Sequence, residues 1–304
     1  IIHANRAIKA GDGHVFIAGG IENMTRGPLV VSKPSSAFGT DSKMYDSSFG
    51  WRFINPKMHQ QYGTDAMGET AENLVDKYNI SREDQDAFAY NSQMKTTKAQ
   101  LSGRLAKEIV AVEIPQRKGE PVVVSNDEGV RASTTMESLA SLKPAFDKTG
   151  TVTAGNASQI SDAGSAVVMM SKRAAEKRGI KPLGEFISYG MVAGPDNASL
   201  LHQPSRSIVK ALERVGKKVS DVDLFEINEA FAAVGVASMR DLGITDENVN
   251  VNGGAIALGH PIGMSGNRLA ITLLYELRRR GGGLGAAALC GGGGQGDALV
   301  LRVD

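Results

Sequence analysis

The sequence predicts a layered α/β protein in which one α/β unit occurs twice, around a stretch of different composition. Three observations predict this. An order of helix, glycine, apolar strand and glycine cluster occurs at residues 1–20 and again at residues 268–294. From residue 151 onward, apolar strand patterns alternate with helical ones. Residues 21–150 are instead polar and rich in turns at first and then helical, which indicates an inserted lid or loop region.

The first copy begins with IIHANRAIKAGDG, whose apolar spacing predicts a helix that ends at the glycines. No residue precedes Ile1 to cap this helix, so we expect the chain to begin inside an element. HVFIAGG follows as a buried strand that ends in a Gly-Gly turn.

The insertion opens with a polar stretch at 32–58 and continues with two helices. Ser81 is expected to cap the second helix, because Glu83 and Asp84 fill its first turn. Two strands and a short helix follow, at residues 107–114, 121–125 and 138–146. The alternating part then predicts strands at 164–171, 183–194, 223–228 and 284–290, and helices at 172–179, 204–216, from about Ala230 to Gly243, and at 268–280.

Composition excludes several classes of partner. The chain has 34 basic and 33 acidic residues, and the one basic run, Arg278 to Arg280, is expected to close a helix, so nucleic acid is not an expected partner. One cysteine and five scattered histidines predict no internal disulfide and no metal site. The absence of a long apolar run or a signal pattern predicts a soluble, cytoplasmic protein without a membrane partner.

Three motifs point to chemistry. His260 lies within NVNVNGGAIALGHPIGMSGNR, and Cys290 lies within ALCGGGGQG. Glycine-rich turns can expose N–H groups that hold an oxyanion, which favours carbonyl chemistry. FEINEAFAA places Asn228 and Glu229 where a strand meets a helix, and ligands bind at such strand ends. Taken singly, each feature is more often a turn, a packed histidine or a small buried hydrophobe.

With NEAFA, GGAIALGHPIGMSG and CGGGGQG in this order, the chain resembles the thiolases, which make or cleave 3-ketoacyl-coenzyme A. The resemblance extends to MGETAEN, SREDQDAFA and GTVTAGNAS, and so to essentially the whole chain. YDSSFGWRFINPKM and YGTDAMGETAEN look most like the bacterial acetyl-coenzyme A acetyltransferase and 3-oxoadipyl-coenzyme A thiolase group.

The resemblance implies two similar α/β halves stacked in five layers, with a loop domain inserted in the first. It implies a homodimer or homotetramer, with coenzyme A and acyl-coenzyme A as substrates and no covalently bound cofactor. The implied division is 1–30 and 151–182 for the N-terminal half, 31–150 for the loop domain, and 183–304 for the C-terminal half.

Catalytic roles carry over where the motifs coincide. Cys290 matches the acid/base cysteine, whose pKa we expect neighbouring N–H dipoles and a histidine to lower. His260 matches the histidine that activates the nucleophile and, through Nε2–H, helps bind the thioester oxygen. Asn228 matches the asparagine that positions a water in that oxyanion site, and Gly292 offers a backbone N–H to a second one.

For coenzyme A, the resemblance implies Ser158 against the pantetheine and Arg131 near the nucleotide. Met67, Phe146 and Phe231 are implied as apolar walls. The alternative for Arg131 is a solvated loop residue, and for the two phenylalanines it is ordinary core.

The departure from the family that matters most concerns the acyl-accepting cysteine. Thiolases use a second, acyl-accepting cysteine in a C-x-S-G-x-x-A turn before a helix that resembles IIHANRAIKAGDG, and here that helix opens at Ile1. We therefore expect these 304 residues, taken alone, to be inactive. Two alternatives remain open: a non-catalytic, coenzyme A-binding thiolase-like subunit, and a thioester hydrolase with Cys290, His260 and Asn228 as nucleophile, base and orienter.

Overall fold

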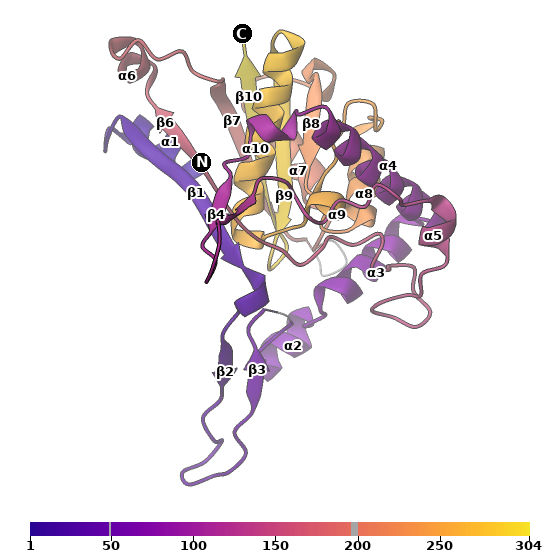
Figure 1. Cartoon of the computed structure of the whole chain (residues 1–304). Coiled ribbons are helices and arrows are strands. Elements are labelled where there is room, and N and C mark those ends of the chain that lie inside the picture. The colour runs from indigo at the N-terminus through magenta and orange to yellow at the C-terminus, as the bar shows by residue number, and fades with distance from the viewer. Residues whose placement is uncertain (49, 196–199) are drawn as a thin grey trace.

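The computed structural model describes residues 1–48, 50–195 and 200–304. Residue 49, inside the polar stretch at 32–58, and residues 196–199 lie outside the described part. A four-stranded sheet forms the centre of the molecule, in the order β7 (Glu185–Ala193), β10 (Gln295–Val303), β9 (Gly283–Gly291) and β8 (Leu224–Ile227). β8 runs parallel to β9, so the chain between them must cross over, and it does so through three helices (Figure 1).

Helices cover both faces of this sheet. α7 (Pro204–Glu213) and α8 (Ala232–Leu242) pack on one face, and α10 (Ile262–Arg280) packs on the other. The strands contribute side chains to both faces of the sheet, because successive side chains point to opposite faces. In β10, Ala298 and Val300 join the α7 side of the core, while Leu299 and Leu301 join the α10 side.

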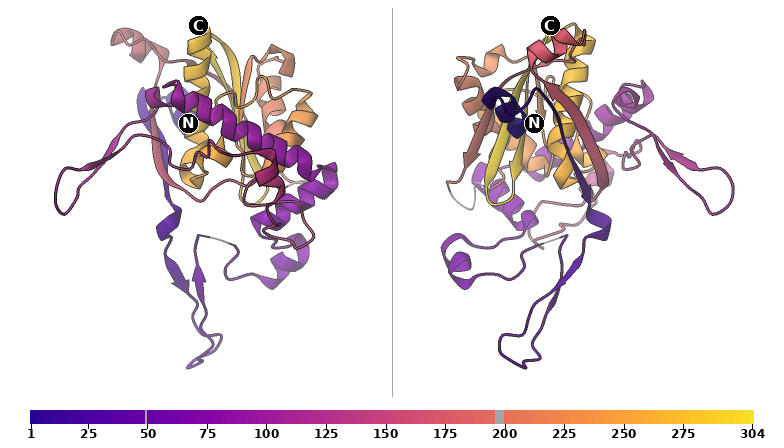
Figure 2. Two further views of the ribbon diagram at one scale, coloured as in Figure 1. Left: turned by 45° about the vertical axis from the view of Figure 1, so that its right-hand side comes forward. Right: turned by 90° about the vertical axis from the view of Figure 1, so that its left-hand side faces the viewer.

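A second, two-stranded sheet lies beyond α10. It pairs β1 (Val15–Asn23) antiparallel with β6 (Asp162–Met170). α10 contacts both sheets, and so does α1 (Ile2–Ala10), as Figure 2 shows. The backbone of β1 approaches α10 so closely that a Cβ on Gly20 would lie 1.7 Å from the carbonyl oxygen of Gly263, so only glycine fits there.

The outer face of β1 is exposed, with Ile17 and Ile21 at 78% and 80% of full exposure. The described residues therefore build four layers: the small sheet, α1 with α10, the large sheet, and α7 with α8. The α/β class is confirmed, but the expected fifth layer is not among the residues that the structure describes.

The chain between β1 and β6 forms the insertion. It begins with an extended hairpin, β2 (Leu29–Val31) and β3 (Met44–Asp46), which reaches away from the body (Figure 1). Its remaining helices and strands are α2 (Pro56–Tyr62), α3 (Met67–Tyr78), α4 (Arg82–Leu101), β4 (Val112–Ile114), β5 (Val122–Val124) and α5 (Met136–Ala140). α6 (Lys172–Lys177) and α9 (Ala255–Leu258) are short helices outside the insertion. Short 3-10 turns occur within the insertion at Met24–Arg26 and Leu105–Lys107, and outside it at Val219–Asp221.

The local predictions held in part. Ser81 caps α4, since its hydroxyl accepts a hydrogen bond from the backbone N–H of Asp84 at 3.0 Å. The expected start of α8 near Ala230 is wrong, because Phe231 is extended and bridges to Ala157. The four-segment division stays a prediction. Across the described ranges, no helix combines the length and apolarity needed to cross a bilayer.

Candidate active site

Asn228 is the first residue after β8, at the edge of the sheet where the strand ends. Its backbone N–H continues the ladder to β9 by donating to the carbonyl of Ala288 at 2.9 Å. Its side-chain Nδ2 lies 3.2 Å from Nε2 of His260. Asn228 is fully buried, and its Oδ1 has no hydrogen-bond partner within the described structure. An unpaired buried acceptor of this kind is rare and costly in proteins.

His260 occupies the turn between α9 and α10. Gly259 gives this turn a φ of +92°, which side-chain-bearing residues rarely adopt. The His260 backbone N–H donates to the carbonyl of Gln159 at 3.1 Å, and ring Nδ1 lies 2.6 Å from Oγ of Ser265. Both ring nitrogens therefore have partners, which fixes the ring plane.

Burial also sets the protonation of His260. Burial, with a smaller contribution from the positive charge of Arg268, lowers the pKa of the imidazole to about 4. At neutral pH the ring is uncharged, so it can accept a proton. This is the state that a base requires before the nucleophile is activated.

Cys290 lies near the end of β9, beside the same sheet edge. Ile227 pairs with Ala288, which puts Cys290 about 7 Å further along the neighbouring strand. The thiol packs in the core cluster that includes Ala230, Phe231 and Ile256. No hydrogen bond joins Cys290 to His260 in the part of the chain that the structure describes. The three motifs thus share one edge of the sheet, and a side-chain contact at 3.2 Å joins Asn228 to His260.

The expected lowering of the cysteine pKa is wrong. Burial raises the pKa of Cys290 to about 11, and the opposing backbone hydrogen bond is the smaller effect. The group is therefore a protonated thiol at neutral pH. It is suited first to giving up a proton, and it becomes a base only where a ligand or a charge stabilises the thiolate.

Gly292 lies in the exposed turn that follows β9. A Cβ built on it would meet no atom within 4 Å, so there is open space beside its backbone. Gly293 and Gly294 have φ values of +77° and +74°, which keeps this turn tight. Space beside a tight glycine turn is the condition for a backbone N–H to reach an incoming oxygen.

Glu229 follows Asn228 at the end of the strand, and the sequence patterns assign it no role. Its buried carboxylate accepts hydrogen bonds from Ser92 Oγ at 2.6 Å, Asn250 Nδ2 at 2.8 Å and the backbone N–H of Ile256 at 3.0 Å. A Cβ on Gly254 would lie 2.3 Å from this carboxyl group. The carboxylate thus ties the Asn228 turn to α4 and to the loop that carries His260.

The expected coenzyme A residues fall into two groups. Phe146 and Phe231 lie together, with their rings 6.0 Å apart and edge to face, and Ser158 N–H donates to the carbonyl of Ala230, the residue before Phe231, at 3.0 Å. Met67 begins α3 beside Gly68, whose backbone lies against the Phe146 ring. Phe146 and Met67 are half exposed, at 50% and 44%. This combination of half-exposed apolar side chains and one hydroxyl fits the wall of an acyl or pantetheine channel.

Arg131 belongs to another part of the insertion. Its backbone N–H donates to Gln93 Oε1 at 2.8 Å, while its side chain is exposed. Gln93 in turn contacts the carbonyl of Ile256 at 3.4 Å. The Arg131 loop is therefore joined to α9, the helix before His260, and its side chain faces solvent.

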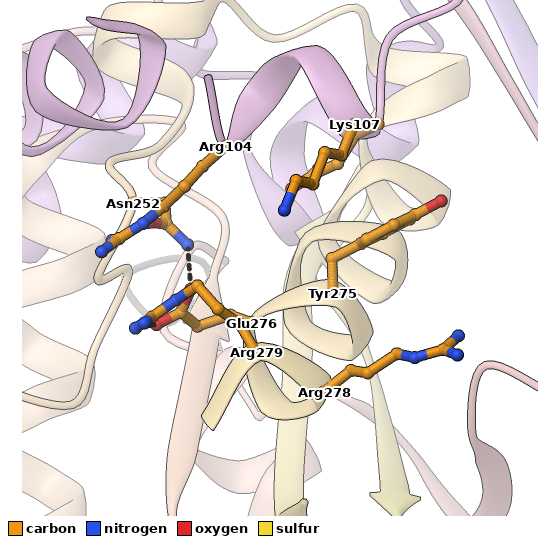
Figure 3. Close-up of a pocket in the computed structure, with 8 residues that line it drawn as sticks. Arg104, Lys107, Asn252, Tyr275, Glu276, Arg278 and Arg279 are labelled. Atoms are coloured by element: carbon orange, nitrogen blue, oxygen red, sulfur yellow. Dashed lines mark hydrogen bonds and ion pairs between the residues drawn. The ribbon is translucent and has the colours of Figure 1, made fainter. Parts of the chain in front are cut away.

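A polar cleft lies far from these residues, at the C-terminal end of α10 (Figure 3). Tyr275, one of its lining residues, is about 20 Å along the helix axis from the end that carries His260. Among its lining residues, an ion pair joins Glu276 to Arg279. Glu276 bonds to Arg279, Arg280 and Asn252, and Arg104 donates to Asn252 Oδ1 at 3.1 Å. The cleft lies at the basic end of α10, where Arg278 to Arg280 form the last turn of the helix as expected.

The chain matches two family models: the N-terminal domain of thiolase over residues 1–173, and the C-terminal domain of thiolase over residues 180–303. It is 49% identical, over 99% of its length, to the beta-ketoadipyl-CoA thiolase of Acinetobacter baylyi, and 48% identical over 98% to a probable acetyl-CoA acetyltransferase of Mycolicibacterium smegmatis. In both cases it spans 76% of the relative.

Solved structures with a similar fold support the same family. The acetyl-CoA acetyltransferase of Bacillus anthracis has a TM-score of 0.89 at 42% identity, with 99% of this chain and 75% of that one covered. Human mitochondrial 3-ketoacyl-CoA thiolase in complex with CoA has a TM-score of 0.90 at 36% identity, with 100% and 74% covered. The chain belongs to the thiolase family.

Proposed function

We propose that this chain carries the acid/base and oxyanion-binding part of a thiolase site, for acyl transfer between a 3-ketoacyl-coenzyme A and coenzyme A. The observation that carries the proposal is the contact between Asn228 and His260 at the end of β8, beside the strand that holds Cys290. The family and the names of the relatives support the reaction class.

Each residue in the proposed site transfers a proton or binds the thioester oxygen. His260, uncharged at neutral pH, accepts the proton of the acyl-accepting thiol at one ring nitrogen, and the resulting N–H then donates to the thioester oxygen. Asn228 supplies a donor to the same oxygen, through a bound water. Cys290, a thiol at neutral pH, returns a proton to the enolate in cleavage, and in synthesis its thiolate removes a proton from the α-carbon of acetyl-coenzyme A.

The proposed substrate is more specific than the family assignment. The 47–49% identity to beta-ketoadipyl-CoA thiolases of several bacteria supports 3-oxoadipyl-coenzyme A as a substrate, with acetoacetyl-coenzyme A as the shorter alternative. Met67, Phe146, Phe231 and Ser158 would line the pantetheine and acyl channel, and Arg131 would meet the nucleotide. We propose a homodimer or homotetramer as the working assembly.

Acyl-enzyme formation needs a thiolate that accepts the acyl group, and the 304 residues contain one thiol, Cys290. One sulfur cannot carry the acyl group and act as the base for the second substrate at the same time. We therefore propose that a polypeptide of these residues binds coenzyme A thioesters without turning them over, as in the non-catalytic alternative.

The hydrolase alternative is less well supported. It needs Cys290 as a thiolate activated by His260, whereas burial favours the thiol and no hydrogen bond joins the two residues within the described ranges. Intact mass spectrometry after incubation with acetoacetyl-coenzyme A separates the three cases. Binding without an acyl adduct supports the proposal, an adduct on Cys290 with release of free acid supports the hydrolase, and an adduct with transfer to coenzyme A contradicts the claim of inactivity.

A further inference from the structure

We propose that Ser265 is a positioning residue that holds the ring proton of His260 on Nδ1 and so leaves Nε2 as the proton acceptor. The inference deepens the proposed function, since it names the residue that decides which nitrogen of His260 meets the nucleophile. Ser265 lies in the first turn of α10 and is 1% exposed, so its hydroxyl bonds to protein groups and not to bulk water.

The Ser265 hydroxyl has two neighbours and one proton. Oγ lies 2.6 Å from Nδ1 of His260 and 3.0 Å from the carbonyl oxygen of Pro261, four residues earlier. Ser265 Oγ is the donor in its bond to Pro261, since a carbonyl oxygen can only accept, and this is the usual serine back-bond of a helix. The lone pair of Oγ then faces Nδ1, which must carry the hydrogen.

The opposite side of the ring points to the same tautomer. Nδ2 of Asn228 lies 3.2 Å from Nε2, and an amide NH2 can only donate. Nε2 must therefore offer its lone pair. Two independent contacts, from α10 and from the end of β8, thus assign the proton to Nδ1 and the lone pair to Nε2.

This arrangement serves both stages of the proposed reaction. When a thiol is activated, its S–H bond breaks, the hydrogen bond from Asn228 to Nε2 is given up, and the proton forms an N–H bond at Nε2, which leaves a thiolate and an imidazolium. Nδ1–H continues to donate to Ser265 throughout, so the ring does not need to turn. The new Nε2–H then faces the thioester oxygen, while the hydroxyl of Ser265 neither gains nor loses a proton.

The test uses histidine-labelled protein and reads each ring nitrogen by long-range proton–nitrogen NMR, with His260→Gln to assign the signals among the five histidines. We expect a pyrrole-type Nδ1 and a pyridine-type Nε2 for His260 at neutral pH. Ser265→Ala should shift the ring toward a mixture of tautomers, because the acceptor for Nδ1–H is lost. Ser265→Thr keeps the hydroxyl and should restore the original signals.

Ser238→Ala is the matched control, since Ser238 is another buried serine, on α8, and its hydroxyl has no hydrogen-bond partner within the described structure. It should leave the His260 signals unchanged. A pyrrole-type Nε2 in the unmodified protein, or unchanged His260 signals in a folded Ser265→Ala variant, overturns the inference. If the nitrogens behave as expected but no thioester binds, the proposed function fails and this inference stands.

Discussion

Nδ2 of Asn228 lies 3.2 Å from Nε2 of His260, although 32 positions of sequence separate the two residues. The contact exists because β8 ends at Ile227 and because the loop after α9 returns to the same edge of the sheet. The carboxylate of Glu229 binds the backbone N–H of Ile256 and so holds that loop in place. In the proposed function, an amide and an imidazole fixed in this way bind one oxygen without reorganisation during the reaction.

Removing the amide should weaken enolate formation. Exchange of the α-protons of acetyl-coenzyme A for deuterium needs a base and oxyanion donors but no acyl-accepting thiol, so it can be measured on this chain by NMR. We expect Asn228→Ala to slow the exchange about a hundredfold or more. Cys290→Ala should abolish it. Equal exchange rates for Asn228→Ala and the unmodified protein would contradict the role of this amide.

His260 should make stability depend on pH. Its pKa is about 6.5 in the unfolded chain and about 4 in the folded protein, so protons bind preferentially to the unfolded state between these values. The free energy of unfolding should therefore fall as the pH drops from about 6.5 to about 4, by up to about 3 kcal/mol. Urea unfolding at several pH values measures it. The same slope in His260→Gln would show that other groups cause the effect.

Cys290 should react slowly with iodoacetamide at neutral pH. Burial raises the pKa of its thiol to about 11 and also shields it, while the thiolate is the reactive form. The rate should rise steeply toward pH 11, and a saturating coenzyme A thioester should protect the thiol. Rapid labelling at pH 7 in the folded protein would favour the hydrolase alternative.

Glu229 should be a large contributor to stability. Glu229→Ala leaves three buried donors without an acceptor, on Ser92, Asn250 and Ile256, and each such loss costs about 1–3 kcal/mol. We expect a total loss of at least about 3 kcal/mol by urea unfolding. Glu247→Ala, at an exposed glutamate, is the control and should change little. A loss below about 1 kcal/mol for Glu229→Ala would refute the bridging role.

Phe146 should contribute to coenzyme A binding. Its ring is half exposed and rests against Phe231 and Gly68, so a ligand that covers it would bury further apolar surface. Phe146→Ala should weaken binding about tenfold by calorimetry, while Phe146→Leu should lose less. Phe38→Ala, on the fully exposed hairpin, is the control. Unchanged affinity for Phe146→Ala would make this residue ordinary surface.

Local patterns predicted most of the fold. Apolar periodicity located the main strands and helices of the second half, and Ser81 with its acidic neighbours located the start of α4. The start of α8 could not be predicted in this way, because Phe231 is kept extended by its bridge to Ala157, some seventy residues earlier.

The site also has some features that local sequence patterns predict and others that only the folded structure shows. Glycine-rich turns identified His260 and Cys290, because such turns carry a signal in the sequence itself. Ser265 gave a weaker signal, as a serine five residues after His260, and it was missed. The partners of Glu229 and the raised pKa of Cys290 left no sequence signal, since both depend on packing between distant segments.

A crystal structure with a non-cleavable acetyl-coenzyme A analogue tests the central claim most directly. We expect the pantetheine arm to pass Phe146 and Ser158, and the thioester oxygen to lie against His260 and the water or amide of Asn228, with Cys290 facing the α-carbon. An analogue bound elsewhere, for example in the arginine-lined cleft at the end of α10, would contradict the claim that these three residues converge on one carbonyl.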